Sequence, residues 1–305
     1  MSPYTELAVT SNFSFLRGAS HPEELVARAA ELGLSAIGIA DHNSFAGVVR
    51  AHAIARTCGI RLLTGVRLVT RDGFEVLAYP QDRAAYGRLC RLLTRGNRRA
   101  RKGQCDLSLE DILEFSEGQL FVLLPDAGML GSIQQNCETD DATKSSLDLS
   151  MRAYARFCQA ASRLIAAAPE RVWLGIAITY GARSERGLAA AAALARDLGI
   201  TLLAHNDVHY HCPERRALFD VLTCIREKCT IDTAGKRLLA NAEFHLKDHK
   251  EMVRLFRRHP QAITATQIFV SQITFSLDEL RYHYPDDAIG GAGTPQDILT
   301  RLAFD

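Results

Sequence analysis

Two short stretches place acidic and imidazole side chains directly after apolar segments. Asp207–His209 follows the apolar run 202–204, and Asp41–His42 follows the apolar run 36–40. Carboxylate and imidazole groups are the usual protein ligands of divalent transition metals. Residues just past the carboxyl ends of strands line the pocket in barrels and open α/β sheets. The two stretches therefore predict one shared pocket of the metal-hydrolase type.

The segments that must hold these residues alternate between two patterns. Short apolar runs predict strands at 6–10, 36–40, 61–69, 74–78, 120–124, 172–178 and 202–204. Helical spacing of apolar residues predicts helices at 22–32, 45–58, 86–93, 109–115, 147–167 and 187–198. Asp72 and Gly73 predict a hairpin after the third strand, because this pair accepts the positive φ of a tight turn. Six or seven such units predict an α/β fold, with parallel strands in a distorted (β/α)7-type barrel rather than an open sheet.

Composition sets the class of protein. The chain has 305 residues, 47% of them apolar, which is enough to bury a sizeable core. Its 36 Lys and Arg nearly balance its 35 Asp and Glu, so no global field draws it to nucleic acid or membrane. The eight cysteines are scattered without a CxxC pair, and no apolar run reaches the roughly 20 residues of a membrane helix. These features predict a soluble, cytoplasmic protein with reduced thiols and no membrane partner.

The pattern changes after residue 210. Helices are expected at 215–227 and 251–259, followed by a Gly/Asp-rich linker at 286–294 and a final helix that the sequence cuts short. A polar segment at 134–146 is expected to be a loop. We therefore predict a barrel domain at 1–225, and at 226–305 a connecting segment with the truncated beginning of a further region.

Several ordered segments resemble one family. SNFSFLRGASHPEELV (11–26), IADHNSFAGVVRAH (39–52), AHNDVHYHCPERRALFDVLTCIRE (204–227) and NAEFHLKDHKEMVRLF (241–256) are similar to the N-terminal PHP (polymerase and histidinol phosphatase) region of bacterial C-family DNA polymerases. The best-known member of that family is the polymerase III alpha subunit. The SNFSFLRGASHP segment, together with HYPD near 283–286, resembles the error-prone branch. The polymerase aspartates of the family are expected beyond residue 305.

The resemblance implies a function for the longer protein. It implies DNA-directed DNA synthesis by an error-prone nucleotidyltransferase, acting in damage-induced translesion synthesis, DNA repair and DNA replication. DNA, a sliding clamp and a mutagenesis accessory protein are the implied partners, and Mg²⁺ is implied at a polymerase site outside this chain. Within this chain, the resemblance implies a scaffold with no catalytic residue and no cofactor of its own.

The resemblance also implies where metal ligands should be. Working PHP pockets hold up to three metal ions, and their first His-x-His pair falls on Ala8 and Thr10 of this chain. Two acidic ligand positions fall on Arg17 and Arg67. Ala has no lone pair, a Thr hydroxyl is a poor ligand for transition metals, and a guanidinium repels a dication at close range.

Three implied ligand positions keep a suitable side chain: His42, Asp207 and His209, with Asp41 as a possible fourth. Three ligands beside two arginines should not build the multi-metal site that phosphoester hydrolysis uses. We therefore expect a degenerate pocket, with residual zinc or manganese absent. We also expect the arginines to pair with Asp41 or Asp207 in place of the metal.

Other interpretations of the same residues stay open. Asp41 is also a good acceptor for the first N–H groups of the following helix. His205 and His211 flank the second stretch and are interpreted as surface histidines. A basic run predicts either a phosphate-binding surface for DNA or an exposed, solvated loop. The run consists of Arg95, Arg98, Arg99, Arg101 and Lys102.

Two alternative functions also remain. The first is a free-standing, metal-dependent PHP phosphoesterase or 3′–5′ nuclease, which would activate water with a bound metal. The residues at positions 8, 10 and 67 argue against it. The second is a truncated, inactive binding module, which the interrupted final helix and the polar segment 134–146 keep open.

Overall fold

The computed structural model describes residues 4–126, 129–130, 141–178, 180, 184–281 and 294–304. Seven strands form one sheet in chain order from β1 to β7. The strands are β1 (Glu6–Val9), β2 (Ala36–His42), β3 (Arg61–Val69), β4 (Glu75–Pro80), β5 (Gln119–Leu123), β6 (Val172–Ala177) and β7 (Thr201–His205). The predicted α/β barrel architecture is confirmed.

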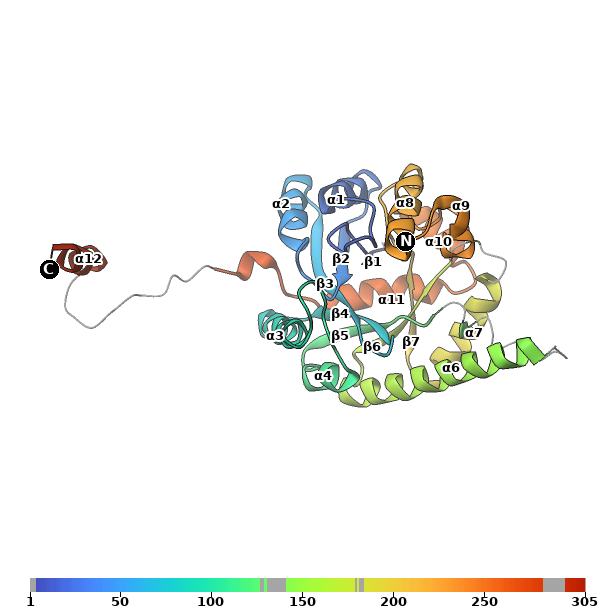
Figure 1. The fold of residues 1–305 in the computed structure, drawn as a ribbon. Coiled ribbons are helices and arrows are strands. Elements are labelled where there is room, and N and C mark those ends of the chain that lie inside the picture. Colours follow the sequence, from blue (N-terminus) through green and yellow to red (C-terminus); the bar gives the residue numbers. More distant parts are fainter. Residues whose placement is uncertain are drawn as a thin grey trace.

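Helices surround this sheet (Figure 1). They are α1 (Pro22–Glu31), α2 (Val48–Cys58), α3 (Arg83–Arg99), α4 (Leu109–Glu114), α6 (Asp141–Ala167), α7 (Ser184–Asp197), α8 (Arg216–Glu227), α9 (Ile231–Ala234), α10 (His249–Leu255) and α11 (Pro260–Ser271), whereas the further helix α12 (Pro295–Phe304) is not among those around the sheet. Apolar residues on the outward faces of the strands pack against these helices in a large core, which buries more than one side chain from most of them.

Strand β4 runs opposite to its neighbours. It pairs antiparallel with both β3 and β5, whereas the other neighbouring pairs in the described sheet are parallel. The cause is the predicted hairpin after β3, where Gly73 has φ +83° and its N–H donates to the Thr70 carbonyl at 3.0 Å. The prediction of parallel strands is therefore wrong for β4, because a connection as short as residues 70–74 can only join antiparallel strands.

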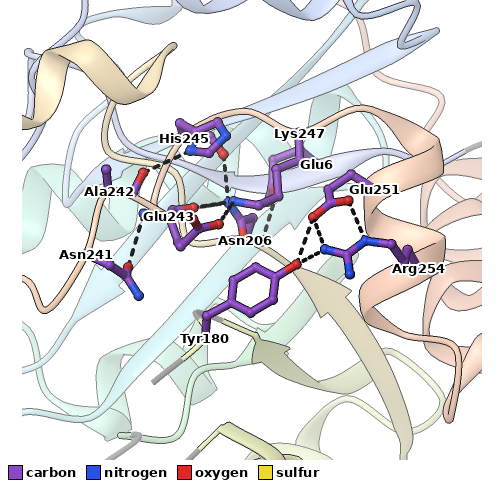
Figure 2. Close-up of polar contacts among 10 residues, drawn as sticks. All are labelled: Glu6, Tyr180, Asn206, Asn241, Ala242, Glu243, His245, Lys247, Glu251 and Arg254. Atoms are coloured by element: carbon purple, nitrogen blue, oxygen red, sulfur yellow. Dashed lines mark hydrogen bonds and ion pairs between the residues drawn. The ribbon is translucent and has the colours of Figure 1, made fainter. Parts of the chain in front are cut away.

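A side chain helps to close the barrel between β1 and the segment that follows β7. The backbone closes the gap at Val208, which exchanges hydrogen bonds of 2.8 Å with Ala8 and Thr10. Beside this bridge, the buried carboxylate of Glu6 accepts the Asn206 backbone N–H at 2.8 Å. Figure 2 shows Glu6 next to Asn206, whose side-chain amide in turn donates to the carbonyls of residues 243 and 245 at 2.7 Å. The carboxylate therefore takes the place of a ladder bond at the seam.

Three aromatic side chains lie among the aliphatic residues that fill the interior of the barrel. Tyr79 lies over Gly38 and Gly65, where a Cβ atom on either glycine would come within 2.3 Å of the Tyr79 ring or hydroxyl. Phe269 of α11 meets Tyr79 and Trp173 edge-on, with ring centroids 5.5 and 4.9 Å apart. Helix α11 therefore completes the inner core, although its residues come late in the chain.

Several expected element boundaries differ from the structure. Helix α3 continues to Arg99 rather than ending near residue 93, so part of the basic run is helical. Helix α6 begins at Asp141, inside the segment expected to be a loop, while 131–140 lie outside the described residues. Helix α11 was not expected. The HYPD segment and most of the 286–294 linker also lie outside the described residues. The domain division at residue 225 stays a prediction.

None of the described helices has the length and apolar character needed to cross a lipid bilayer.

Candidate functional site

The predicted site residues come together at one end of the barrel. His42 is the last residue of β2, and it lies in register with Arg67 on the neighbouring strand β3. Asp207 follows β7 and adopts φ +47°, a left-handed conformation that few residues other than glycine, Asn and Asp tolerate. This turn points Asp207 back across the barrel end towards β3.

Arg67 and Asp207 form a buried ion pair. Nη2 of Arg67 donates to Oδ1 of Asp207, and Nη1 lies 3.8 Å from Oε2 of Glu75. The Arg67 side chain is only 7% exposed. Although burial opposes its charge, Asp207 and Glu75 raise the pKa of the Arg67 guanidinium. Burial by itself would raise the pKa of the Asp207 carboxyl. The charges of Arg67 and His209 outweigh burial and hold that pKa well below its usual range.

Histidines surround this ion pair. Nε2 of His209 lies 3.6 Å from Oδ2 of Asp207, and its ring stacks on Phe219 with centroids 4.9 Å apart. Burial, followed by the charges of Arg67 and Arg17, lowers the pKa of His42 well below its usual value. His42 therefore favours the neutral form, because it is buried beside two fixed cations.

Asp41 does not face this group. Its Oδ1 accepts hydrogen bonds from the Ser11 N–H at 2.8 Å and the Ser14 hydroxyl at 2.6 Å, and its Oδ2 accepts the Ser11 hydroxyl at 2.8 Å. Burial raises the pKa of Asp41, and these hydrogen bonds oppose that change. The expected pairing with an arginine is therefore found for Asp207 and not for Asp41.

Helix α2 begins after Gly47 without a side-chain cap, so the capping role considered for Asp41 is wrong.

His205 is buried rather than on the surface, with 5% of its area exposed. Its Nδ1 accepts the Asp207 backbone N–H at 3.1 Å, and burial lowers its pKa to about 4. His211 is partly buried and shares a 2.8 Å hydrogen bond with the Ser20 hydroxyl. The interpretation of these two histidines as surface residues is therefore wrong for His205.

The arrangement does not suit a metal cluster. Ala8 and Thr10 are buried at the expected ligand positions, and the Thr10 hydroxyl has no hydrogen-bond partner. Arg67 instead places its guanidinium against the carboxylate that a metal would need. Among the described residues, no three His, Cys, Asp or Glu side chains are grouped so that they could hold an ion. The described residues therefore do not fit the multi-metal centre of a working PHP pocket.

A cavity of about 480 Å³ opens beside the ion pair. Arg67, Asp207 and His205 form one wall. Glu75 and Asp126 also line it, and sequence reasoning missed both. Glu75 pairs with Val69 across the predicted hairpin, two residues beyond Arg67 on β3, so the hairpin was the signal that could have placed Glu75 near Arg67. Burial raises the pKa of Glu75, and the charge of Arg67 opposes that rise.

The basic run divides into two groups. Arg95 forms two hydrogen bonds with Glu114, at 2.5 and 2.7 Å, and Arg99 binds Asp111 at 2.7 Å. The other three cations of the run are exposed: Arg98, Arg101 and Lys102. The run is therefore not a simple solvated loop, because two of its arginines connect α3 to α4. Its predicted contact with DNA stays a prediction.

The fold and sequence define the family. The chain belongs to the PHP domain family, whose model matches residues 6–178. The structure of a protein described as a putative metal-dependent phosphoesterase from Bifidobacterium adolescentis aligns with a TM-score of 0.44 at 14% identity, over 84% of this chain and 98% of its own.

Relatives with higher sequence identity indicate the error-prone branch. A protein named error-prone DNA polymerase from Bradyrhizobium sp. is 46% identical over 99% of this chain and 25% of its own length. Proteins of the same name from Caulobacter vibrioides and Brucella abortus are 45% and 46% identical, over 26% and 27% of their lengths. The resemblance to the PHP region of error-prone polymerases is confirmed. The chain spans about a quarter of the length of these relatives.

Proposed function

We propose that this chain is the PHP part of an error-prone DNA polymerase and acts there as a scaffold without metal-dependent hydrolysis. The observation that carries the proposal is the buried pair of Arg67 and Asp207, at a position where working PHP pockets hold metal. The name of the relatives, error-prone DNA polymerase, supports DNA-directed DNA synthesis on a DNA substrate, and to this the proposal adds translesion synthesis and DNA repair in the cytoplasm. Mg²⁺ in the polymerase part, a sliding clamp and a mutagenesis accessory protein belong to the same proposal.

The ion pair gives the scaffold a physical basis. It connects β3 to the segment after β7, so one contact spans the barrel end that metal ions would otherwise cross-link. Breaking such a pair would leave one buried charge alone, which costs several kcal/mol, about 3–5 in measured cases. The pair can therefore hold the two sides together without a bound ion, and it occupies the Asp207 carboxylate that would otherwise be available to a metal.

Primer extension by the purified gene product that contains this chain tests the proposal. We expect it to extend a primer opposite an abasic site with Mg²⁺, and to release no nucleotides from the primer 3′ end with Mn²⁺ or Zn²⁺. The His42→Ala variant should extend the same primer at the wild-type rate, because His42 performs no chemistry in this account. Failure to extend any primer would contradict the polymerase assignment. Metal-dependent primer shortening that His42→Ala abolishes would contradict the scaffold.

A further inference from the structure

Positive charge is concentrated in one segment of a chain that is otherwise balanced. Between residues 83 and 105 there are eight cationic side chains and no Asp or Glu, whereas the whole chain carries 36 cations and 35 acids. Most of this segment is helix α3, which lies on the outside of the barrel (Figure 1). Such a local excess creates a positive surface even on a nearly neutral protein.

Three of these cations are already paired. Arg88 lies 3.7 Å from Glu117, Arg95 binds Glu114, and Arg99 binds Asp111. Ser108 adds two further hydrogen bonds to Asp111, and the pKa of that carboxyl is lowered to about 2, because these bonds and the arginines outweigh its burial. Arg95 and Arg99 therefore hold α4 against α3, and all three arginines have little charge left for a ligand.

Each acidic side chain of α4 also has a cationic partner. Glu110 binds both terminal nitrogens of Arg163, at 2.5 and 2.7 Å. Together with Asp111 and Glu114, this accounts for every acidic side chain on α4. No acid of α4 is therefore left to neutralise the remaining cations of α3.

Four exposed cations remain in the second half of α3, which Arg91 begins, and in the turn that follows: Arg91, Arg98, Arg101 and Lys102. None of them has an acidic partner in the described part of the chain. Arg83, the eighth cation, lies at the other end of the helix. We call the four residues the cationic ridge.

The turn of the cationic ridge is held in place. The Asp106 N–H donates to the Gly96 carbonyl at 3.0 Å, and the Gln104 N–H donates to the Arg101 carbonyl at 2.9 Å. A Cβ atom at Gly96 would lie 2.5 Å from the Cys105 sulfur, so the glycine allows this close approach. The ridge is therefore presented by an ordered element, which lowers the entropic cost of binding.

We propose that the cationic ridge binds the phosphate backbone of duplex DNA without reading its sequence. Arg91 and Arg98 are seven residues apart on one helical face, so they lie roughly 10 Å apart along the axis. Each strand of a duplex offers a phosphate about every 3.4 Å along its axis, so two side chains at this spacing can contact the same strand. The choice of DNA as the partner rests on the proposed polymerase function. The unpaired positive charge of the ridge is observed in the structure and does not depend on that function.

Removing the four cations together tests this assignment. The variant Arg91→Ala, Arg98→Ala, Arg101→Ala and Lys102→Ala should bind a duplex DNA of random sequence at least tenfold more weakly at low salt, measured by fluorescence anisotropy on the full 305-residue chain. The slope of log affinity against log salt should become shallower by about 3–4, because each phosphate contact contributes about 0.9. Exposed side chains without partners should change stability little.

A matched control removes the same charge elsewhere. Lys236, Arg237, Lys250 and Arg257 are exposed cations in or near α9 and α10, away from α3 (Figure 1). Their quadruple alanine variant should keep wild-type affinity within about twofold, because the proposal depends on position rather than net charge. Equal losses in both variants, or no duplex binding by the wild type, would overturn the proposal. So would tighter binding to anionic phospholipid vesicles than to DNA. Any of these results would leave the account of the Arg67 pocket untouched.

Discussion

Replacing Asp207 with asparagine is expected to lower the free energy of unfolding by about 3 kcal/mol, because it leaves the buried Arg67 guanidinium without its partner. Arg67 is only 7% exposed, so water solvates its guanidinium far less than at the surface, and the remaining acid, Glu75, is farther away at 3.8 Å. Asparagine is the appropriate substitute, since it keeps the shape and tolerates the left-handed backbone at this position. Urea unfolding followed by circular dichroism measures the change.

Two further variants isolate the ion pair. Glu75→Gln should cost less than about 1 kcal/mol, because Glu75 is 3.8 Å from Arg67 and about one third exposed. Arg67→Met combined with Asp207→Asn should recover most of the stability lost in Asp207→Asn, since no lone buried charge remains. If Asp207→Asn proved harmless, or if the double variant were less stable than the single one, the pair would not be the structural link that we describe.

The second large effect is expected at the seam of the barrel. Glu6→Ala should destabilise the fold by about 4 kcal/mol or more, because it leaves four buried donors without an acceptor. These are the N–H groups of Leu7, Ala8 and Asn206, at 2.8–3.0 Å, and the Tyr4 hydroxyl at 2.6 Å. Thermal and urea unfolding of the purified variant measure the loss.

Milder variants keep this prediction testable if Glu6→Ala does not fold. Glu6→Gln retains one carbonyl oxygen at the seam and should lose about half as much stability as Glu6→Ala, on the order of 2 kcal/mol. Tyr4→Phe removes a single donor and should cost about 1 kcal/mol. A Glu6→Ala protein within 1 kcal/mol of the wild type would show that the backbone bridge at Val208 closes the barrel without the carboxylate.

Local patterns predicted most of the barrel because its strands are short apolar runs separated by polar turns. The expected strand at 61–69 has the same bounds as β3, and Asp72-Gly73 correctly indicated the hairpin. Helix α11 was missed for a physical reason. It is buried on several sides, with Ala262, Ala265 and Phe269 among its six buried residues, so it lacks the single apolar stripe that identifies a surface helix.

The site was only partly predictable. The resemblance located His42, Asp207, His209 and Arg67, and chemistry alone indicated that an arginine would pair with a carboxylate. Which carboxylate it would choose depends on contacts between residues 140 positions apart, which no local pattern encodes. The burial of His205 was missed for the same reason. It depends on how β7 packs within the sheet, and the neighbouring sequence does not encode that packing.

We propose that the ion pair of Arg67 and Asp207 stands where working PHP pockets hold metal. The most direct measurement is the zinc and manganese content of the purified chain by mass spectrometry, after incubation with excess metal and removal of unbound ions by gel filtration. We predict much less than one ion per chain, with the same value for wild type and for His42→Ala. One or more ions per wild-type chain, lost in both His42→Ala and Asp207→Asn, would contradict it.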